Sequence, residues 1–229
     1  LCFIKNMPKL RNLAIRAWWP FVLMIGTNMN MMSQVMDPGN LAYENARTNA
    51  LDHIIDAEGG YVNKAADRGG ETKHGVTANT LNELKGKHKY YLQFDTVKDM
   101  TKEGAKNVYA DEHLTFHETN YGENRVALKM TEISVNTGGG KATKIMQRAL
   151  NDLWQDFIIE EDGKMGDGTR GLYQETLNTF SEDAIIESLV TQQKKYYKQL
   201  VAFDDSQDIF LEGWLERAEY RPPVIDVIW

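Results

Sequence analysis

The stretch Glu58-Gly59-Gly60-Tyr61-Val62-Asn63 decides the fold, because it ends one helix and begins a polar, glycine-rich loop. Leu51, Ile54 and Ile55 precede it with the spacing of one apolar helical face. The two glycines then favour the left-handed backbone in which many helices end. The sequence therefore predicts a helix over residues 40–57 that places Glu58 at its C-terminal end.

A carboxyl group at that end of a helix lies at the negative pole of the helix dipole, which favours the protonated form that a general acid needs. Asp67 follows in the turn-prone segment Ala65-Ala66-Asp67-Arg68-Gly69-Gly70, where exposure to water favours the carboxylate. Two carboxyl groups with opposite protonation preferences suit glycoside hydrolysis. Taken locally, a Glu before Gly-Gly is more often a solvated helix end, and an Asp before Gly is more often a turn.

The complete string is more specific than either carboxyl group alone. It continues through Gly69-Gly70-Glu71-Thr72-Lys73 and Gly75-Val76-Thr77, and it resembles the signature of glycoside hydrolase family 108, the bacterial and phage N-acetylmuramidases. Ile133-Ser134-Val135-Asn136-Thr137-Gly138 resembles the family's second helix signature, and Ile145-Met146-Gln147-Arg148-Ala149-Leu150 resembles the start of its C-terminal peptidoglycan-binding-type module. The resemblance implies an α+β, mostly helical, lysozyme-like fold with a small β lobe beside the catalytic loop.

The same resemblance implies catalytic roles for three residues. Glu58 matches the family's catalytic acid, and Asp67 and Thr72 match positions that hold or activate the attacking water. In two places the chain departs from the family: residues 63–70 lack its loop prolines, and Leu114-Thr115-Phe116-His117 replaces its usual Tyr-Trp. Spacing in sequence gives no distance between the carboxyl groups, so the inverting and retaining mechanisms both stay open.

Three further residues are candidates for binding the sugar: Tyr61, His74 and Asn136. Each has a structural alternative, because Tyr61 can pack under the loop, His74 can be a turn residue and Asn136 can cap a helix end. The implied reaction is hydrolysis of the β-1,4 bond between N-acetylmuramic acid and N-acetylglucosamine by a phage endolysin that lyses its host. Such a reaction requires no cofactor and no metal.

Composition narrows the choice of partners. The 229 residues are 42% hydrophobic, enough for an ordinary core, and their formal net charge is −7. That charge argues against nucleic acid as a partner and mildly against electrostatic attraction to an anionic cell wall. Bacterial peptidoglycan is the partner that the family resemblance implies. The single cysteine, Cys2, forms no internal disulfide framework and no cysteine-rich zinc motif. We expect a monomer.

Residues 1–36 differ from the rest of the chain. Four basic residues up to Arg16 precede the uncharged run 17–36, a pattern that keeps the N-terminus inside and directs the remainder of the chain across the membrane. Polar residues such as Asn28 and Asn30 make the run a weak membrane helix. We therefore expect a signal-anchor that tethers the protein to the inner membrane before its release into the periplasm. A cleaved signal peptide, a buried amphipathic helix and a translated upstream extension are alternatives.

Other chemistries have weaker support. His113 and His117 are spaced as i and i+4, which suits a zinc-dependent peptidoglycan amidase, but Leu114 occupies the position where the common metallopeptidase motif has Glu. We therefore expect surface or cleft-edge histidines. Residues 161–169 lack the ligand pattern of a calcium loop and predict a turn between two helices. A non-catalytic peptidoglycan-binding protein is the remaining alternative.

The expected layout is an anchor or signal peptide at 1–36, a catalytic region at 40–140, a helical peptidoglycan-binding-type module at 141–220 and a surface tail at 221–229. A small hairpin lobe is expected over residues 61–77. Thr77, Thr101, Thr169 and Ser181 are suitable N-caps. The predicted helices after the lobe cover residues 78–85, 101–114, 124–136, 141–156, 169–180, 182–203 and 209–219.

Overall fold

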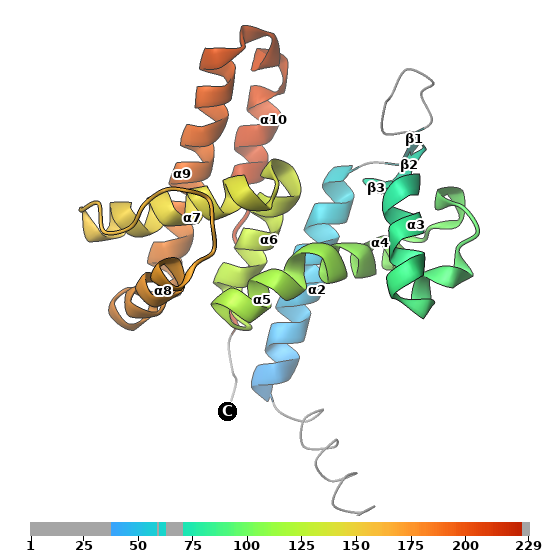
Figure 1. Ribbon diagram of the computed structural model, residues 1–229, viewed down its shortest axis with the longest axis horizontal. Helices are drawn as coiled ribbons and strands as arrows, with labels where there is room; N and C mark the ends of the chain where they lie inside the picture. Colours follow the sequence, from blue (N-terminus) through green and yellow to red (C-terminus); the bar gives the residue numbers. More distant parts are fainter. Residues whose placement is uncertain (1–37, 59, 63–70, 226–229) are drawn as a thin grey trace, which may run out of the picture. The chain divides into compact units, whose positions relative to one another are not determined.

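The computed structural model describes residues 38–58, 60–62 and 71–225 (Figure 1). Residues 45–225 form one compact unit, and the described residues 38–44 belong to a second. The predicted N-terminal segment 1–36 and the candidate Asp67 lie outside the described residues. Within the part that is described, no helix combines the length and the apolar character needed to cross a bilayer.

The helix α2 (Pro38–Glu58) ends at Glu58, and a small antiparallel sheet follows. Its strands are β1 (Tyr61–Val62), β2 (Thr72–Lys73) and β3 (Val76–Thr77), with Tyr61 opposite Lys73 and Thr72 opposite Thr77. His74 and Gly75 connect β2 to β3, and both have positive φ angles, +52° and +76°, as a two-residue type I′ turn requires. The expected α+β fold with a small β lobe is confirmed.

The first two helices after the lobe begin where the sequence predicts. Thr77 caps α3 (Ala78–Lys87) by accepting a hydrogen bond from the Thr80 amide (3.1 Å). Two 3₁₀ turns, η1 (Lys89–Gln93) and η2 (Val97–Asp99), lead to α4 (Lys102–Tyr109), which Thr101 caps. The predicted end at Leu114 is wrong. The chain passes through one turn of π-helix, η3 (Ala110–Leu114), into α5 (Thr115–Tyr121), because the next residue that favours a helix end is Gly122, with φ +84°.

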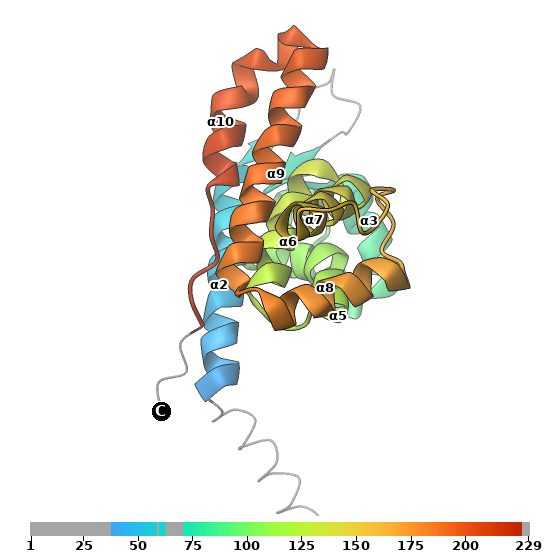
Figure 2. The same ribbon diagram turned by 90° about the vertical axis from the view of Figure 1, so that its left-hand side faces the viewer.

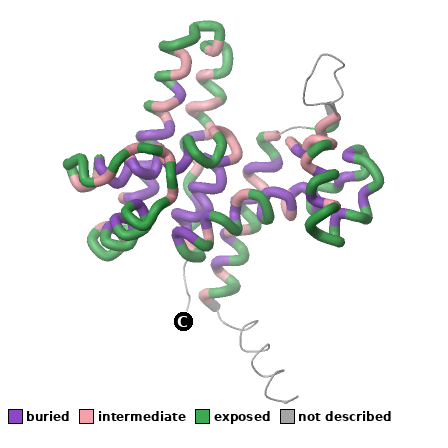
Figure 3. Tube along the Cα trace, in the orientation of Figure 1, coloured by how far each residue is buried: buried purple, intermediate pink, exposed green. Residues whose placement is uncertain are grey.

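The central helix is α6 (Arg125–Thr137), which packs against α5, α7 (Gly139–Trp154) and α9 (Glu182–Phe203). Asn124 caps it by accepting from the Ala127 amide (3.0 Å). Every residue from 125 to 134 is buried, and Figure 3 shows the helix as mostly buried. Helices cover this element on several sides, so its polar side chains require partners inside the protein.

The remaining helices are α8 (Asp167–Thr179), η4 (Asp205–Gln207) and α10 (Asp208–Ala218). α9 and α10 lie side by side in both views (Figures 1 and 2). Ser181 caps α9 as predicted. The predicted cap Thr169 is wrong: α8 begins two residues earlier, and the buried Thr169 hydroxyl instead accepts a hydrogen bond from the Gln147 amide (3.1 Å).

The predicted surface tail, residues 221–229, does not lie entirely at the surface. Pro222 is buried, and its carbonyl oxygen accepts a hydrogen bond from Nε of Arg125 (2.9 Å). Arg125 also forms an ion pair with Asp183 on α9 (2.6 Å). The residues after α10 are therefore held against the N-terminal ends of α6 and α9.

Candidate active site

Glu58 is the last residue of α2, and its side chain is 26% exposed. Leu51, Ile54 and Ile55 are buried on the same helix, as their spacing predicts. Burial of that face fixes the direction in which α2 ends, and therefore where the carboxyl group of Glu58 lies. The carboxyl group is both held by the core and accessible to solvent.

The turn between β2 and β3 lies directly against this carboxyl group. A Cβ atom at Gly75 would lie 2.9 Å from Oε2 and 3.2 Å from Cγ of Glu58, and would overlap the Tyr109 hydroxyl. The positive φ of Gly75 is a second reason why a side chain is unfavourable there. Glycine is therefore required at this position by the backbone conformation and by the closeness of Glu58.

Tyr109, the last residue of α4, holds the turn in place. Its hydroxyl donates a hydrogen bond to the carbonyl oxygen of His74 (3.0 Å). Burial, reinforced by the negative charge of Glu58, raises the pKa of Tyr109. The phenol therefore stays protonated and remains a donor over the whole physiological pH range.

A residue that the sequence did not indicate, Arg217 on α10, also reaches this site. Its Nη1 lies 3.9 Å from Oε1 of Glu58, and its Nη2 donates to the carbonyl oxygen of Ala57 (3.4 Å). Nη1 also donates to Oδ1 of Asn136. One guanidinium thus connects the C-terminal end of α2 with the C-terminal end of α6. Nothing local marks this arginine, since a basic residue in the last turn of a helix is common.

Asn136 is oriented by a buried network on α6. Its Nδ2 donates to the carbonyl and to Oε1 of Glu132, both at 2.9 Å. Glu132 is fully buried and also accepts from Lys129 (2.8 Å) and Gln193 (3.1 Å). Lys129 further donates to the carbonyl oxygen of Ala218 (3.1 Å), next to Arg217. Burial lowers the pKa of Lys129, and the charge of Glu132 opposes that shift.

The structure places three more of the predicted residues, Tyr61, Thr72 and His74, in the β lobe. Thr72 lies in β2 and His74 in the turn that contacts Glu58, so His74 has the turn position offered as its structural alternative. Tyr61 in β1 donates its hydroxyl to Glu71 (2.9 Å), and the ammonium group of Lys98 lies 5.4 Å from its ring centroid. Of the six predicted site residues, Glu58, His74 and Asn136 are therefore joined by described contacts through Arg217 and Tyr109.

The two histidines considered as zinc ligands have other surroundings. Nδ1 of His113 lies 3.1 Å from the Ser134 hydroxyl. Both histidines line one pocket, as expected of cleft-edge residues. His117 is not at the surface: it is 1% exposed and stacks on Tyr121 at 5.7 Å, because α5 continues beyond Leu114. Burial, with a smaller contribution from His113, lowers the pKa of His117 to about 3. Among the described residues, no three His, Cys, Asp or Glu side chains are grouped to hold a metal ion.

Comparison with known proteins gives two family matches. Residues 51–138 match the family described as Glycosyl hydrolase 108, and residues 141–219 match the one described as Predicted Peptidoglycan domain. The first match contains Glu58, Gly75, Tyr109 and Asn136, and the second contains Arg217. The site described above therefore takes residues from both matched regions.

A search of curated proteins found no match. Among solved structures, the fold is similar to that in "Structure of Brucella abortus SagA", with a TM-score of 0.50 and 22% sequence identity. The alignment covers 76% of this chain and 94% of that one. At this identity the likeness shows a shared fold.

Proposed function

From the match of residues 51–138 to the glycosyl hydrolase 108 family, we propose a mechanism in which Glu58 is the proton donor. The protein is a glycoside hydrolase, a muramidase that cuts the β-1,4 bond between N-acetylmuramic acid and N-acetylglucosamine in peptidoglycan. The observation that supports Glu58 is its position: a partly exposed carboxyl group at the end of α2, between the Gly75 turn and Arg217.

In this mechanism Glu58 protonates the glycosidic oxygen as the bond to the leaving sugar breaks. The carboxylate that remains lies 3.9 Å from the guanidinium of Arg217, which stabilises the negative charge that appears during proton transfer. The Gly75 turn fixes the other side of the carboxyl group. Tyr109 holds that turn through the carbonyl oxygen of His74.

Asp67 and Thr72 complete the proposed machinery. Thr72 lies in β2, two residues before the turn beside Glu58. We assign to the pair the task of holding and activating a water, or to Asp67 the stabilisation of positive charge on the sugar ring. A water that attacks the face opposite the leaving group inverts the anomeric carbon, and a water that attacks the face vacated by the leaving group retains its configuration. NMR of the first product formed therefore shows on which face the water is held.

The biological setting is also a proposal. We infer a phage-encoded endolysin whose segment 1–36 tethers it to the inner membrane, and which causes cytolysis after release into the periplasm. The support is the basic-then-uncharged pattern of that segment. The same proposal assigns catalysis to residues 40–140 and wall binding to residues 141–220. Fractionation of cells that express the full chain, or a chain that begins at Asp37, tests the tether.

The experiment that tests the reaction itself is product analysis of digested peptidoglycan in the presence of a chelator. We expect fragments that end in reducing N-acetylmuramic acid, in an amount unaffected by the chelator. Release of free peptides with loss of activity in chelator would instead support an amidase, and no release by a folded protein would support a binding protein.

A further inference from the structure

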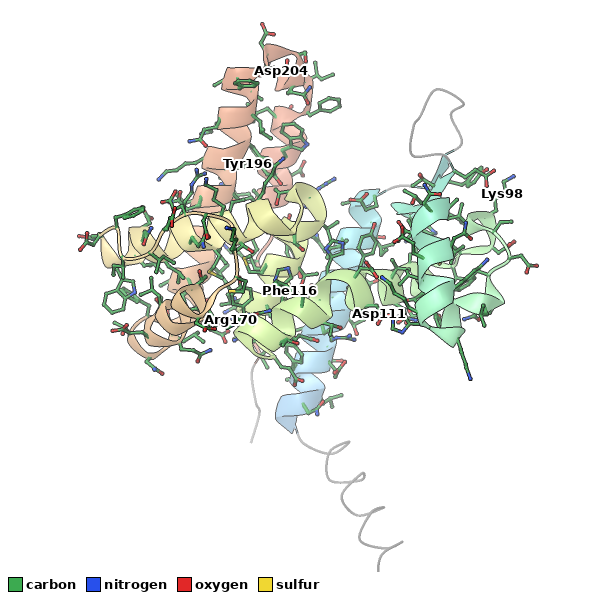
Figure 4. All side chains as sticks on the ribbon, in the orientation of Figure 1. Lys98, Asp111, Phe116, Arg170, Tyr196 and Asp204 are labelled. Atoms are coloured by element: carbon green, nitrogen blue, oxygen red, sulfur yellow. The ribbon has the colours of Figure 1, made fainter. Side chains whose placement is uncertain are left out.

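A pocket that no motif predicts is lined in part by Arg217. Its volume is 310 Å³, and it is formed by the junction of α6 and α7 together with α9 and α10. Tyr196, labelled on α9 in Figure 4, is part of its wall. The side chains that give the pocket its character are Asn136, Lys141, Tyr196, Tyr197, Trp214 and Arg217.

Aromatic rings form much of this wall. The rings of Tyr197 and Trp214 are 5.4 Å apart and tilted by 32°, and Tyr196 lies next to Tyr197 at 5.7 Å. Tyr196 and Trp214 are only partly buried, so part of each side chain is accessible to a ligand. Aromatic faces with a few polar groups are typical of ligand sites, and such faces stack on the apolar side of a sugar ring.

The charged side chains that line the pocket favour an anionic ligand. Lys141 and Arg217 are both in its lining, and none of the described residues that line it is acidic. This is unusual for a chain with a formal net charge of −7. The ammonium group of Lys141 lies 5.9 Å from the ring centroid of Tyr196, so a cation and an aromatic face lie side by side. A carboxylate attached to a sugar ring would contact both.

Arg217 connects the pocket to the reacting bond. The same guanidinium lines the pocket and lies 3.9 Å from Oε1 of Glu58, so a ligand in the pocket is one side chain away from the proton donor. The guanidinium has five N–H donors, and the described contacts use one on Nη1, to Asn136, and one on Nη2, to the Ala57 carbonyl oxygen. The remaining donors suit a carboxylate.

We propose that this pocket is a subsite for the carboxylate-bearing substituent of a muramic acid residue in the strand being cut. The proposal rests on the muramidase function and adds to it the part of the substrate that α9 and α10 recognise. Two sources supply the same chemistry: the carboxylates of the peptide stem, and the lactyl carboxylate that is free where the stem has been removed. The matched peptidoglycan domain then contributes to substrate placement at the catalytic centre.

The test measures binding of the full chain carrying Glu58→Gln to three insoluble polymers. These are intact peptidoglycan sacculi, sacculi stripped of peptides by an amidase, and chitin, which has the sugar rings without carboxylates. Lys141→Glu is compared with Lys198→Glu, the same change at an exposed position of α9 outside the pocket. Tyr196→Ala tests the aromatic wall.

We expect Lys141→Glu to weaken binding to intact sacculi by about fivefold or more and to leave chitin binding unchanged, because only the anionic contact is lost. A loss that appears on stripped sacculi and not on intact ones identifies the lactyl carboxylate, which is bonded to the stem in intact sacculi, and a loss on intact sacculi alone identifies the stem. Tyr196→Ala should weaken binding to all three polymers. No loss with Lys141→Glu, or the same loss on chitin or with Lys198→Glu, would overturn the subsite.

The outcome separates the subsite from the enzyme function. Release of reducing ends by the chain with Glu58 and with Lys141→Glu is measured in parallel. If Glu58→Gln abolishes activity and Lys141→Glu leaves binding unchanged, the proposed function stands and the subsite is disproved. If Glu58→Gln leaves activity unchanged, the proposed mechanism is disproved, independently of what the pocket binds.

Discussion

Nη1 of Arg217 lies 3.9 Å from Oε1 of Glu58, although one residue ends the first described helix and the other lies near the end of the last. Arg217 belongs to the region matched by the peptidoglycan domain, and Glu58 to the region matched by the hydrolase family. The proposed catalytic centre therefore depends on correct docking of α10 against α2 and α6. Removing residues 141–219 is expected to impair the reaction itself as well as wall binding.

Replacing Arg217 tests this dependence. We expect Arg217→Ala to lower kcat by on the order of tenfold to a hundredfold, because the carboxylate formed in the transition state loses the cation 3.9 Å away. Arg217→Lys should restore part of the activity, since the charge returns without the planar fork. The pH–rate profile should also shift, which a loss of packing alone would not cause. Arg221→Ala, at an arginine paired with Glu187 at the surface, is the control; equal effects of the two alanine variants would contradict the assignment.

Gly75→Ala should reduce both stability and activity. The new methyl group would lie within 3 Å of Oε2 of Glu58, at a residue whose φ is +76°. We expect a loss of about 1–3 kcal/mol in the free energy of unfolding, together with a lower kcat. Gly86→Ala is the matched control, since its Cβ would meet no atom within 4 Å and alanine favours the helix by roughly 0.5–1 kcal/mol. Urea unfolding measures the stability of both variants. A Gly75→Ala variant as stable and active as the wild type would refute the close contact between Gly75 and Glu58.

The buried pair Lys129–Glu132 should be costly to break. Both side chains are at most 1% exposed, and Lys129 also holds the end of α10 through Ala218. Lys129→Met leaves the carboxylate of Glu132 buried without its cation, so we expect a loss of about 3–5 kcal/mol. The same substitution at Lys194, whose partner Glu219 is half exposed, should cost at most about 1 kcal/mol. Similar midpoints of denaturation for the two variants would disprove the difference.

His117 should make the fold sensitive to acid. Its pKa is about 3 when folded, below the 6.5 of an unconstrained histidine, because the side chain is buried. The unfolded chain therefore binds a proton first, and this contribution to stability is complete above pH 6.5 and is lost as the pH falls toward 3. The slope is at most about 1.4 kcal/mol per pH unit. Thermal melts between pH 7 and 5 should show a smaller decline for His117→Phe than for the wild type. A variant at the exposed His88 should decline like the wild type.

The features that the sequence predicted well are those decided by neighbouring residues. Thr77, Thr101 and Ser181 cap helices because each side chain bonds to the backbone of its own helix. The position of Glu58 followed from the apolar spacing before it and the glycines after it. Thr169 failed as a cap because its hydroxyl has a tertiary partner, Gln147, that lies on another helix.

The rest of the site depends on contacts between distant parts of the chain. Arg217 has no local feature that distinguishes it, and its role appears only when α10 lies against α2 and α6. The burial of His117 likewise follows from the π-helical turn that continues α4 into α5. No residue between 101 and 114 indicates that turn in the sequence. Such contacts are set by packing of whole helices, which residue spacing does not specify.

The most direct test of the account is the rate at which the full chain with Glu58→Gln releases reducing ends from purified peptidoglycan. Glu83→Gln, the same change at an exposed position of α3, is the control. We predict a loss of at least about 100-fold for Glu58→Gln, because general acid catalysis contributes roughly 10²–10⁴-fold, and wild-type activity for Glu83→Gln. Equal activity of the two folded variants would contradict the assignment of Glu58 as the proton donor.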